Sequence, residues 1–168
     1  MACIEKIYSV SALVGNGACN ANCGFCAGAY LRPQAKENPK YYKNLEAAIK
    51  LSARYGGWSL SLTSSGEPTC DPDSLTKALE VYQNCANQGA YFPNVNLFTN
   101  GILLGDKNFC ENYLPKWKKQ GLTNIALSIH SENEEEQAKA SGLKTYPHFE
   151  DIRENVEAND NRNGRIHQ

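Results

Sequence analysis

Short segments of alternating polar and apolar residues, each followed by a helical pattern, constrain the fold of this chain most strongly. The alternating segments, predicted as strands, are residues 7–14, 58–63, 94–98 and 124–130. The helical patterns that follow them cover residues 45–55, 71–86, 106–117, 131–142 and 149–156. Four strand–helix units in succession predict an α/β fold whose parallel strands are joined by right-handed crossovers.

The two faces of the expected sheet differ in character. The face that we expect to pack against the helices is apolar: Trp58, Leu60, Leu62, Val95, Leu97, Ile125, Leu127 and Ile129. The opposite face is small and polar: Ser9, Ser11, Ser59, Ser61, Thr63, Asn94, Asn96, Ala126, Ser128 and His130. Sheets covered on both faces have strands that are apolar throughout. The polar face therefore predicts a barrel with a hydrated or ligand-filled interior. An antiparallel sheet with one solvent face is the alternative, which the intervening helices disfavour.

The length of the chain bears on how complete this barrel is. A closed eight-fold barrel needs about 250 residues, whereas this sequence has 168. A fifth strand is predicted to begin at residues 164–168, where the sequence ends. We therefore expect either a barrel truncated after about four strand–helix units or a short open barrel that something else completes.

Composition excludes several classes of protein. The chain is 41% hydrophobic and 21% charged, with a net charge of −1, which disfavours a broad nucleic-acid surface. No apolar run approaches the length of about 18 residues that spans a membrane, and the amino-terminal residues do not resemble a secretory signal. Seven cysteines, an odd number, do not suggest a secreted disulfide scaffold. We expect a cytoplasmic protein, in which Cys85 and Cys110 are core residues of helices.

Three further cysteines form a C-x₃-C-x₂-C motif in the loop after the first predicted strand. These residues, Cys19, Cys23 and Cys26, lie within eight positions and are accompanied by glycines and no acidic residue. Three thiolates can hold one face of a metal centre and leave one coordination position open. A structural zinc site needs a closed set of four ligands, whereas an open position is where a substrate or cofactor binds. The motif therefore favours catalysis.

Other polar motifs also follow predicted strands. Residues 64–69 (Ser-Ser-Gly-Glu-Pro-Thr) follow the second strand, 99–101 (Thr-Asn-Gly) the third, and 130–131 (His-Ser) the fourth. In α/β barrels, active sites are built at the carboxyl ends of the strands. The sequence thus predicts one site to which four loops contribute.

The cysteine motif resembles the signature of radical S-adenosylmethionine (radical SAM) enzymes. The resemblance includes the aromatic Phe25 before the last cysteine, and the order of parallel units resembles the family's partial TIM-like (β/α)6 barrel. It covers essentially the whole chain and implies a radical SAM core domain over residues 1–168 that is incomplete at its C-terminus. The family motifs of strands five and six are absent, so we expect this chain alone to lack part of the adenine site and its own activity to be in doubt.

The resemblance implies two cofactors. In the family, three cysteines hold a [4Fe–4S] cluster and leave one iron open. That iron binds S-adenosylmethionine, which the reduced cluster cleaves to methionine and a 5′-deoxyadenosyl radical that abstracts hydrogen from a substrate. A reducing partner such as flavodoxin or ferredoxin would supply the electron. The substrate and the reaction type are not identified by the sequence.

The resemblance also implies roles for single residues. Cys19, Cys23 and Cys26 would bind the cluster, and Phe25 would place its backbone beside the adenine. Gly66 and Glu67 would meet the methionine amino group, although the family usually has a second glycine where this chain has Ser65. The remaining residues implied to lie at the cofactor are Asn100, Ser128 and His130. A plain Asn-Gly turn would equally explain Asn100, and a hydrogen-bonded surface histidine would explain His130.

Two other functions remain open from the sequence. One is a zinc site in which Cys70 or Cys3 joins the three cysteines, although no second C-x₂-C pair is present. The other is a thiol redox protein that uses Cys23 and Cys26, which would leave Cys19 unexplained.

Overall fold

A single parallel sheet organises the structure, a computed structural model that describes residues 6–30 and 38–159. Its strands are β1 (Ser9–Leu13), β2 (Ser59–Thr63), β3 (Asn94–Thr99) and β4 (Asn124–Leu127). They are hydrogen-bonded in the order β1-β2-β3-β4, and every neighbouring pair is parallel. The predicted α/β fold with parallel strands is confirmed, and the alternative of an antiparallel sheet is wrong. The predicted strand at 164–168 and Cys3 lie outside the described residues.

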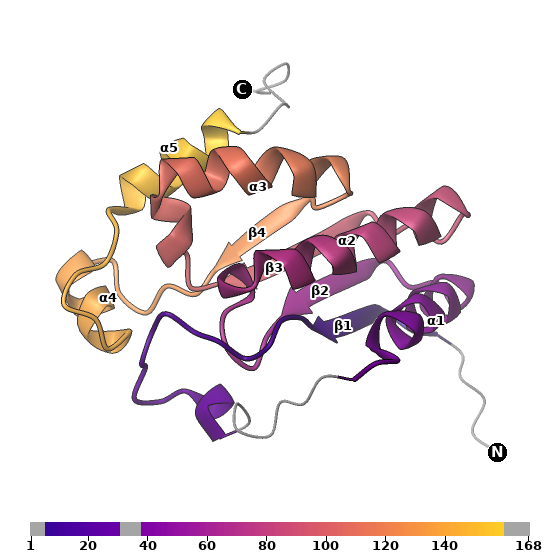
Figure 1. The fold of residues 1–168 in the computed structure, drawn as a ribbon, viewed down its shortest axis with the longest axis horizontal. Coiled ribbons are helices and arrows are strands. Elements are labelled where there is room, and N and C mark those ends of the chain that lie inside the picture. Colours follow the sequence, from indigo (N-terminus) through magenta and orange to yellow (C-terminus); the bar gives the residue numbers. More distant parts are fainter. Residues whose placement is uncertain (1–5, 31–37, 160–168) are drawn as a thin grey trace.

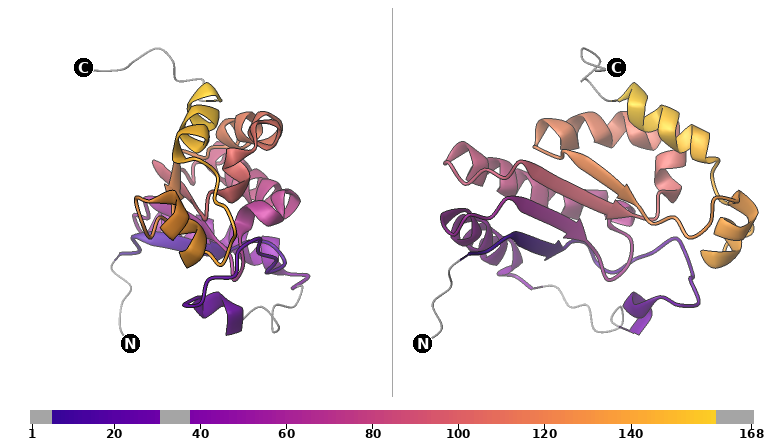
Figure 2. Two further views of the ribbon diagram at one scale, coloured as in Figure 1. Left: turned by 90° about the vertical axis from the view of Figure 1, so that its left-hand side faces the viewer. Right: turned by 180° about the vertical axis from the view of Figure 1, so that it is seen from behind.

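Helices cover one face of this sheet (Figure 1). They are α1 (Tyr41–Arg54), α2 (Pro72–Asn87) and α3 (Lys107–Lys119). Seen from behind, the strands lie in front of these helices, and no helix of the described residues covers the other face (Figure 2). We call this uncovered side the open face. This one-sided arrangement is that of a partial barrel, with the open face toward its interior.

The remaining elements lie around the carboxyl ends of the strands and beside α3. The short 3₁₀ helices are η1 (Ala27–Tyr30), η3 (Pro68–Cys70) and η4 (Ile102–Gly105). Helix α4 (Glu134–Ala140) lies beyond the end of β4, and α5 (Phe149–Ala158) packs against α3 and η4 (Figure 1). No helix in the described ranges is long and apolar enough to cross a bilayer.

The core lies between the sheet and its helices. Leu60, Leu62, Val95 and Leu97 are fully buried, as the alternating pattern predicts. The helices supply the facing side chains: Ile49, Leu75, Leu79, Cys85, Cys110, Leu114 and Trp117. Burial raises the pKa of the Cys110 thiol to about 11, so this cysteine is a core residue, as expected.

Two residues expected on the packed face are instead exposed. Trp58 and Ile129 have exposed fractions of 54% and 49%. Trp58 precedes β2, where its N–H donates to Tyr8 O (3.1 Å) at the amino-terminal edge of the sheet. Ile129 follows β4, which ends at Leu127 rather than at His130 as predicted. The alternation of polar and apolar residues continues past the last hydrogen-bonded pair of the sheet. The pattern alone therefore overestimates the length of the strand.

Helix ends follow the expected capping chemistry with one correction. The Asp71 and Asp106 carboxylates accept hydrogen bonds from backbone N–H groups at the starts of α2 and α3, where the sequence places an aspartate before each helical pattern. Ser131 and Glu134 have the spacing of a capping box, which predicts that Ser131 caps α4, but this prediction is wrong. Asn133 caps α4 by accepting from the N–H groups of Glu135 and Glu136, and Ser131 Oγ instead donates to the Glu136 carboxylate.

The sheet depends on leucines of the packed face, which gives a direct test. Replacing Leu97 by Ala should lower the free energy of unfolding by about 2–5 kcal/mol, because a fully buried side chain leaves a cavity. Leu13 is the matched control, because it belongs to the same sheet but is 60% exposed on the open face. Leu13→Ala should change it by less than about 0.5 kcal/mol. Equal losses in urea unfolding would contradict this division of the two faces.

Candidate functional site

The loop of the cysteine motif begins where β1 ends. Val14 N–H donates to Thr63 O (2.7 Å), which extends the pairing of β1 with β2 by one residue. The chain then turns through Gly15 and Gly17, both with φ of 83°, a conformation that favours glycine. These turns direct the loop across the carboxyl ends of the strands, where the sequence predicts the site (Figure 1).

The three cysteines of the motif lie in this loop as thiols. Cys19, Cys23 and Cys26 are each partly buried, and none forms a disulfide. A turn between Cys23 and Cys26 is closed by the hydrogen bond from Cys26 N–H to Cys23 O (3.2 Å). Among the described residues, no three His, Cys, Asp or Glu side chains converge closely enough to form a metal site. The three thiols therefore lie in one loop, but they do not converge on a common position at which all three could bind one metal ion.

Gly66 holds the cysteine loop against the end of β2. Glu67 N–H donates to Ala18 O (2.8 Å). A Cβ added at Gly66 would lie 2.2 Å from Ala18 O and 2.3 Å from Gly17 O. Only glycine, which has no Cβ, permits the two backbones to approach this closely. Steric crowding therefore explains why residue 66 is glycine, although its φ is not positive. The residue predicted to meet a cofactor also has a packing role.

The Glu67 carboxylate joins the ends of β2 and β3. It is 4% exposed. Oε1 accepts hydrogen bonds from Thr69 N–H (3.0 Å), Thr69 Oγ1 (2.7 Å) and Thr99 Oγ1 (2.6 Å). Oε2 accepts from the backbone N–H of Asn100 (2.7 Å). A buried carboxylate needs such donors because burial otherwise disfavours its charged form. Glu67 therefore fixes the two loops that follow these strands.

Asn100 connects this network to the cysteine loop. Its Nδ2 donates to Asn20 Oδ1 (2.8 Å), and its own Oδ1 accepts from Ile102 N–H (3.1 Å). Tyr146 completes the arrangement by donating its hydroxyl to Asn100 O. The predicted Asn100 thus lies at the site, but its side-chain amide is engaged by the protein. The Asn20 Nδ2, by contrast, is buried and has no hydrogen-bond partner.

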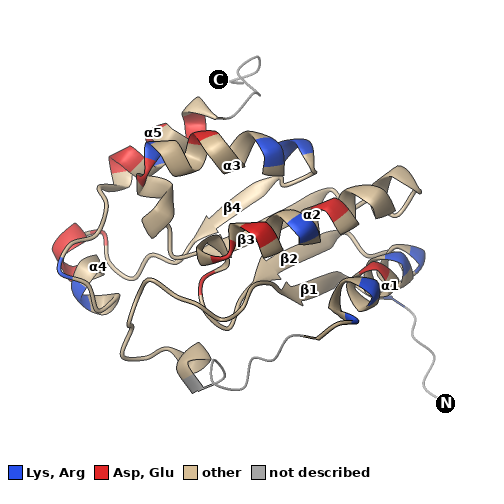
Figure 3. Cartoon of the chain, viewed as in Figure 1, with Lys and Arg blue, Asp and Glu red and all other residues tan. Residues whose placement is uncertain are grey.

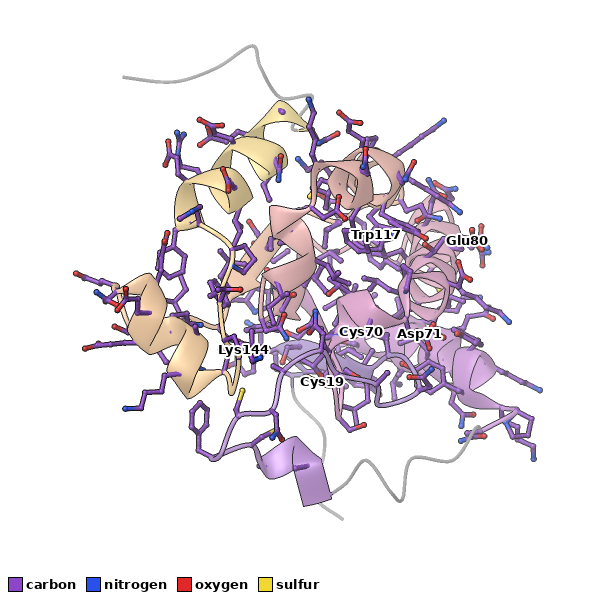
Figure 4. All side chains as sticks on the ribbon, turned by 60° about the vertical axis from the view of Figure 1, so that its left-hand side comes forward. Cys19, Cys70, Asp71, Glu80, Trp117 and Lys144 are labelled. Atoms are coloured by element: carbon purple, nitrogen blue, oxygen red, sulfur yellow. The ribbon has the colours of Figure 1, made fainter. Side chains whose placement is uncertain are left out.

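Cys70 lies beside the first cysteine of the motif (Figure 4). Burial raises the pKa of its thiol, and the negative charges of Glu67 and Cys19 act in the same direction. A hydrogen bond from the backbone N–H of Asn20 opposes these effects. Cys70 therefore faces the cysteine loop.

Phe25 and His130 meet across the site although they come from distant loops. Their rings form an edge-to-face contact with centroids 4.7 Å apart, and Phe25 is 61% exposed. Ser128 and His130 are also exposed. Their backbone is held by the side chain of Gln137, which accepts from His130 N–H (2.7 Å) and donates to Ser128 O (3.2 Å). The residues predicted from strand four and from the cysteine motif are thus neighbours.

Sequence reasoning missed two residues that organise the site. Asn20 lies inside the cysteine motif, and its position next to Cys19 was the available signal. Gln137 is fully buried in α4, but no local pattern distinguishes it from a surface glutamine of a short helix. Its role is visible only once α4 lies against the end of β4.

The donor set of the cysteine loop fits an iron–sulfur cluster in composition. Three cysteines that form no disulfide, and no carboxylate, lie within one loop, and soft thiolate ligands are those that such clusters use. The unpaired Asn20 Nδ2 adds a buried hydrogen-bond donor without an acceptor in the same loop. Both features are consistent with a group that the protein alone does not supply.

Comparison with known proteins assigns the family. A family model described as the Radical SAM superfamily matches residues 14–164, which include the cysteine loop and the strands β2, β3 and β4 but not β1. The chain belongs to the radical SAM superfamily. No curated protein matches it.

The crowded approach at Gly66 predicts a strong effect of a single methyl group. Gly66→Ala should destabilise the chain by about 1–3 kcal/mol, because a side chain overlaps the backbone of the cysteine loop. Gly24→Ala is the matched control, since a Cβ there meets nothing within 4 Å. Urea unfolding measures both, and a control that loses as much as Gly66→Ala would contradict this explanation.

The hydrogen bonds of Glu67 predict a second loss. Glu67→Gln keeps the shape of the side chain but replaces one accepting oxygen by an NH₂ group, which faces donors. We expect a loss of about 1.5–3 kcal/mol in the free energy of unfolding. Glu80→Gln is the control, because Glu80 forms only a surface ion pair with Lys116 (3.6 Å) and should cost about 1 kcal/mol or less. An unchanged stability of Glu67→Gln would show that its hydrogen bonds are not structural.

Proposed function

We propose that this chain is the core of a radical SAM enzyme that uses a [4Fe–4S] cluster and S-adenosylmethionine. When bound, these cofactors supply a reductive cleavage that yields methionine and a 5′-deoxyadenosyl radical able to take a hydrogen atom from a substrate. The observation that supports this most is the position of three cysteines, with C-x₃-C-x₂-C spacing and no disulfide, at the carboxyl edge of a parallel sheet in a member of this superfamily.

Cys19, Cys23 and Cys26 are the proposed cluster ligands. Their partial burial leaves the loop accessible to iron and sulfide, and the protein has no fourth cysteine within the motif. Cys70 belongs to η3, outside the motif, so we do not include it among the ligands. The set of three leaves the open position that S-adenosylmethionine needs.

The remaining predicted residues are proposed to orient S-adenosylmethionine. Glu67 Oε2 accepts one hydrogen bond, so its second lone pair is the position from which it would meet an ammonium group. Gly66 and the Asn100 backbone lie beside it. The backbone of Phe25 is proposed to lie beside the adenine. Ser128 and His130, both exposed just after β4, are proposed to contact the ribose, and the His130 ring is in contact with the ring of Phe25.

The open face is where we propose that the substrate lies. Its strands have no charged residue, and charged side chains lie on the helices and loops (Figure 3). Asn96 Nδ2 donates to Ser59 Oγ (3.1 Å), and Asn124 Nδ2 donates to Asn96 Oδ1 (2.9 Å). These side chains offer neutral hydrogen bonds on the open face. A reducing partner such as flavodoxin or ferredoxin is the proposed electron donor.

Reconstitution with iron and sulfide tests this proposal. Under anaerobic conditions the chain should turn brown and bind about four irons and four sulfides, the content of one [4Fe–4S] cluster. Addition of S-adenosylmethionine should change the electron paramagnetic resonance spectrum of the reduced cluster, because the cofactor binds the open iron. Cys110→Ala should bind as much iron as the unaltered chain, since the Cys110 thiol is fully buried in the core and donates to Leu104 O (3.3 Å).

The Cys19→Ala variant separates this proposal from the two alternatives. It should abolish cluster assembly, whereas a dithiol enzyme that uses Cys23 and Cys26 should keep its disulfide reductase activity. A colourless protein that retains stoichiometric zinc in place of iron would support the zinc site and overturn the cluster.

A further inference from the structure

The side-chain amide of Asn20 is an unusual feature of the cysteine loop. Nδ2 is buried, yet it has no hydrogen-bond partner among the described residues. A buried donor left without an acceptor costs about 1–3 kcal/mol, and most such groups in folded proteins are satisfied. Asn20 directly follows Cys19, the first cysteine of the motif.

The orientation of this amide is determined by its neighbours. Asn100 Oδ1 accepts from Ile102 N–H (3.1 Å), so Asn100 Nδ2 is the group that faces Asn20. Because Nδ2 is a donor only, Asn20 must present Oδ1 to it, at 2.8 Å. Turning the Asn20 amide over would place two NH₂ groups against each other. The free N–H group of Asn20 therefore points away from Asn100.

Asn100 is itself held in place. Its backbone N–H donates to the buried Glu67 carboxylate (2.7 Å), and its carbonyl accepts from the Tyr146 hydroxyl. The carboxylate is in turn fixed by hydrogen bonds from Thr69 and Thr99. A chain of hydrogen bonds thus runs from the ends of β2 and β3 to the residue beside Cys19, and it orients one unused donor.

The Oδ1 atom of Asn20 is therefore engaged by a protein group, whereas Nδ2 is not. Residues 6–30 and 38–159, which the structure describes, offer no acceptor for Nδ2, so an acceptor in a bound group is the one to consider.

We propose that Asn20 Nδ2 donates a hydrogen bond to an anionic acceptor of the bound cofactors, and that Asn100 orients it for this purpose. The acceptor is a sulfur of the cluster or the carboxylate of S-adenosylmethionine. This inference rests on the proposed function, since both acceptors belong to its cofactors. Asn20 is then a cofactor-binding residue, and Asn100 and Glu67 are positioning residues.

The two acceptors give different signatures. A hydrogen bond to a cluster sulfur stabilises the more negative, reduced cluster and so raises its reduction potential. Loss of that bond should make the potential more negative even without S-adenosylmethionine. A hydrogen bond to the carboxylate should leave that potential unchanged and weaken S-adenosylmethionine binding about tenfold or more, because bonds to charged groups contribute about 1.5–3 kcal/mol.

Two substitutions of Asn20 remove the donor in different ways. Asn20→Asp keeps the shape and the acceptor for Asn100 but has no N–H group, and it adds a charge. Asn20→Leu adds no charge but removes both hydrogen bonds. An effect that both variants share therefore reports the lost donor. Asn155→Leu is the matched control, because Asn155 Nδ2 also donates a hydrogen bond (to Leu104 O, 3.0 Å) but belongs to α5, outside the cysteine loop and the open face.

The experiment uses the full chain, reconstituted anaerobically, with the iron content of each variant measured first. The cluster potential is determined by a redox titration followed by electron paramagnetic resonance, and S-adenosylmethionine binding by equilibrium titration. We expect both Asn20 variants to shift the potential downward or to weaken binding, while Asn155→Leu matches the unaltered protein.

The outcomes distinguish this inference from the proposed function. If the unaltered chain forms no cluster, the proposed function fails. If the cluster forms and both Asn20 variants match the unaltered chain in potential and in affinity, the inference is overturned and Nδ2 is an unsatisfied packing group. Where Asn20→Leu loads too little iron to measure, the isosteric Asn20→Asp decides alone, and an unchanged potential and affinity in that variant overturns the inference.

Discussion

The buried carboxylate of Glu67 is the interaction on which the site depends. It accepts four hydrogen bonds from residues that follow two neighbouring strands, and the N–H of the same residue donates to the cysteine loop. Because a charged carboxylate tolerates burial only when its oxygens are satisfied, these donors cannot move independently. The loops after β1, β2 and β3 are therefore one rigid unit rather than three flexible segments.

These three loops lie at the carboxyl edge of the sheet, and the two faces of the sheet differ in their contribution to stability. Leucines and valines of the strands pack against the helices and supply the hydrophobic stabilisation, while the serines and asparagines of the open face contribute little to it. The open face is therefore free to bind other molecules without a cost to the core. Its edge residues Leu13 and Phe98 are exposed beside the cysteine loop, which gives that end of the face an apolar border.

Much of the fold follows from local patterns of the sequence. Alternation in the strands correctly identifies Leu60, Leu62 and Leu97 as core residues, because burial on one face is a property of the strand itself. The same rule is wrong for Trp58 and Ile129, since the pattern does not record where the ladder stops. The prediction that Ser131 caps α4 is also wrong. Ser131 and Asn133 are both residue types that cap helices well, and only the path of the chain selects between them.

The site, like the fold, contains residues that local sequence patterns identify and residues that they do not. The cysteines and Gly66-Glu67 are recognisable because their function depends on spacing within a few residues. The Asn20–Asn100 pair is separated by 80 positions, and asparagines are common enough in loops that nothing local identifies two that meet. Gln137 is hidden for the same reason. What the sequence lacks is therefore the orientation of amide groups, which depends on all of their neighbours at once. The Asn20 NH₂ group has no partner among the described residues once all of these hydrogen bonds are formed. It is consequently more informative about a bound group than the hydrogen bonds themselves.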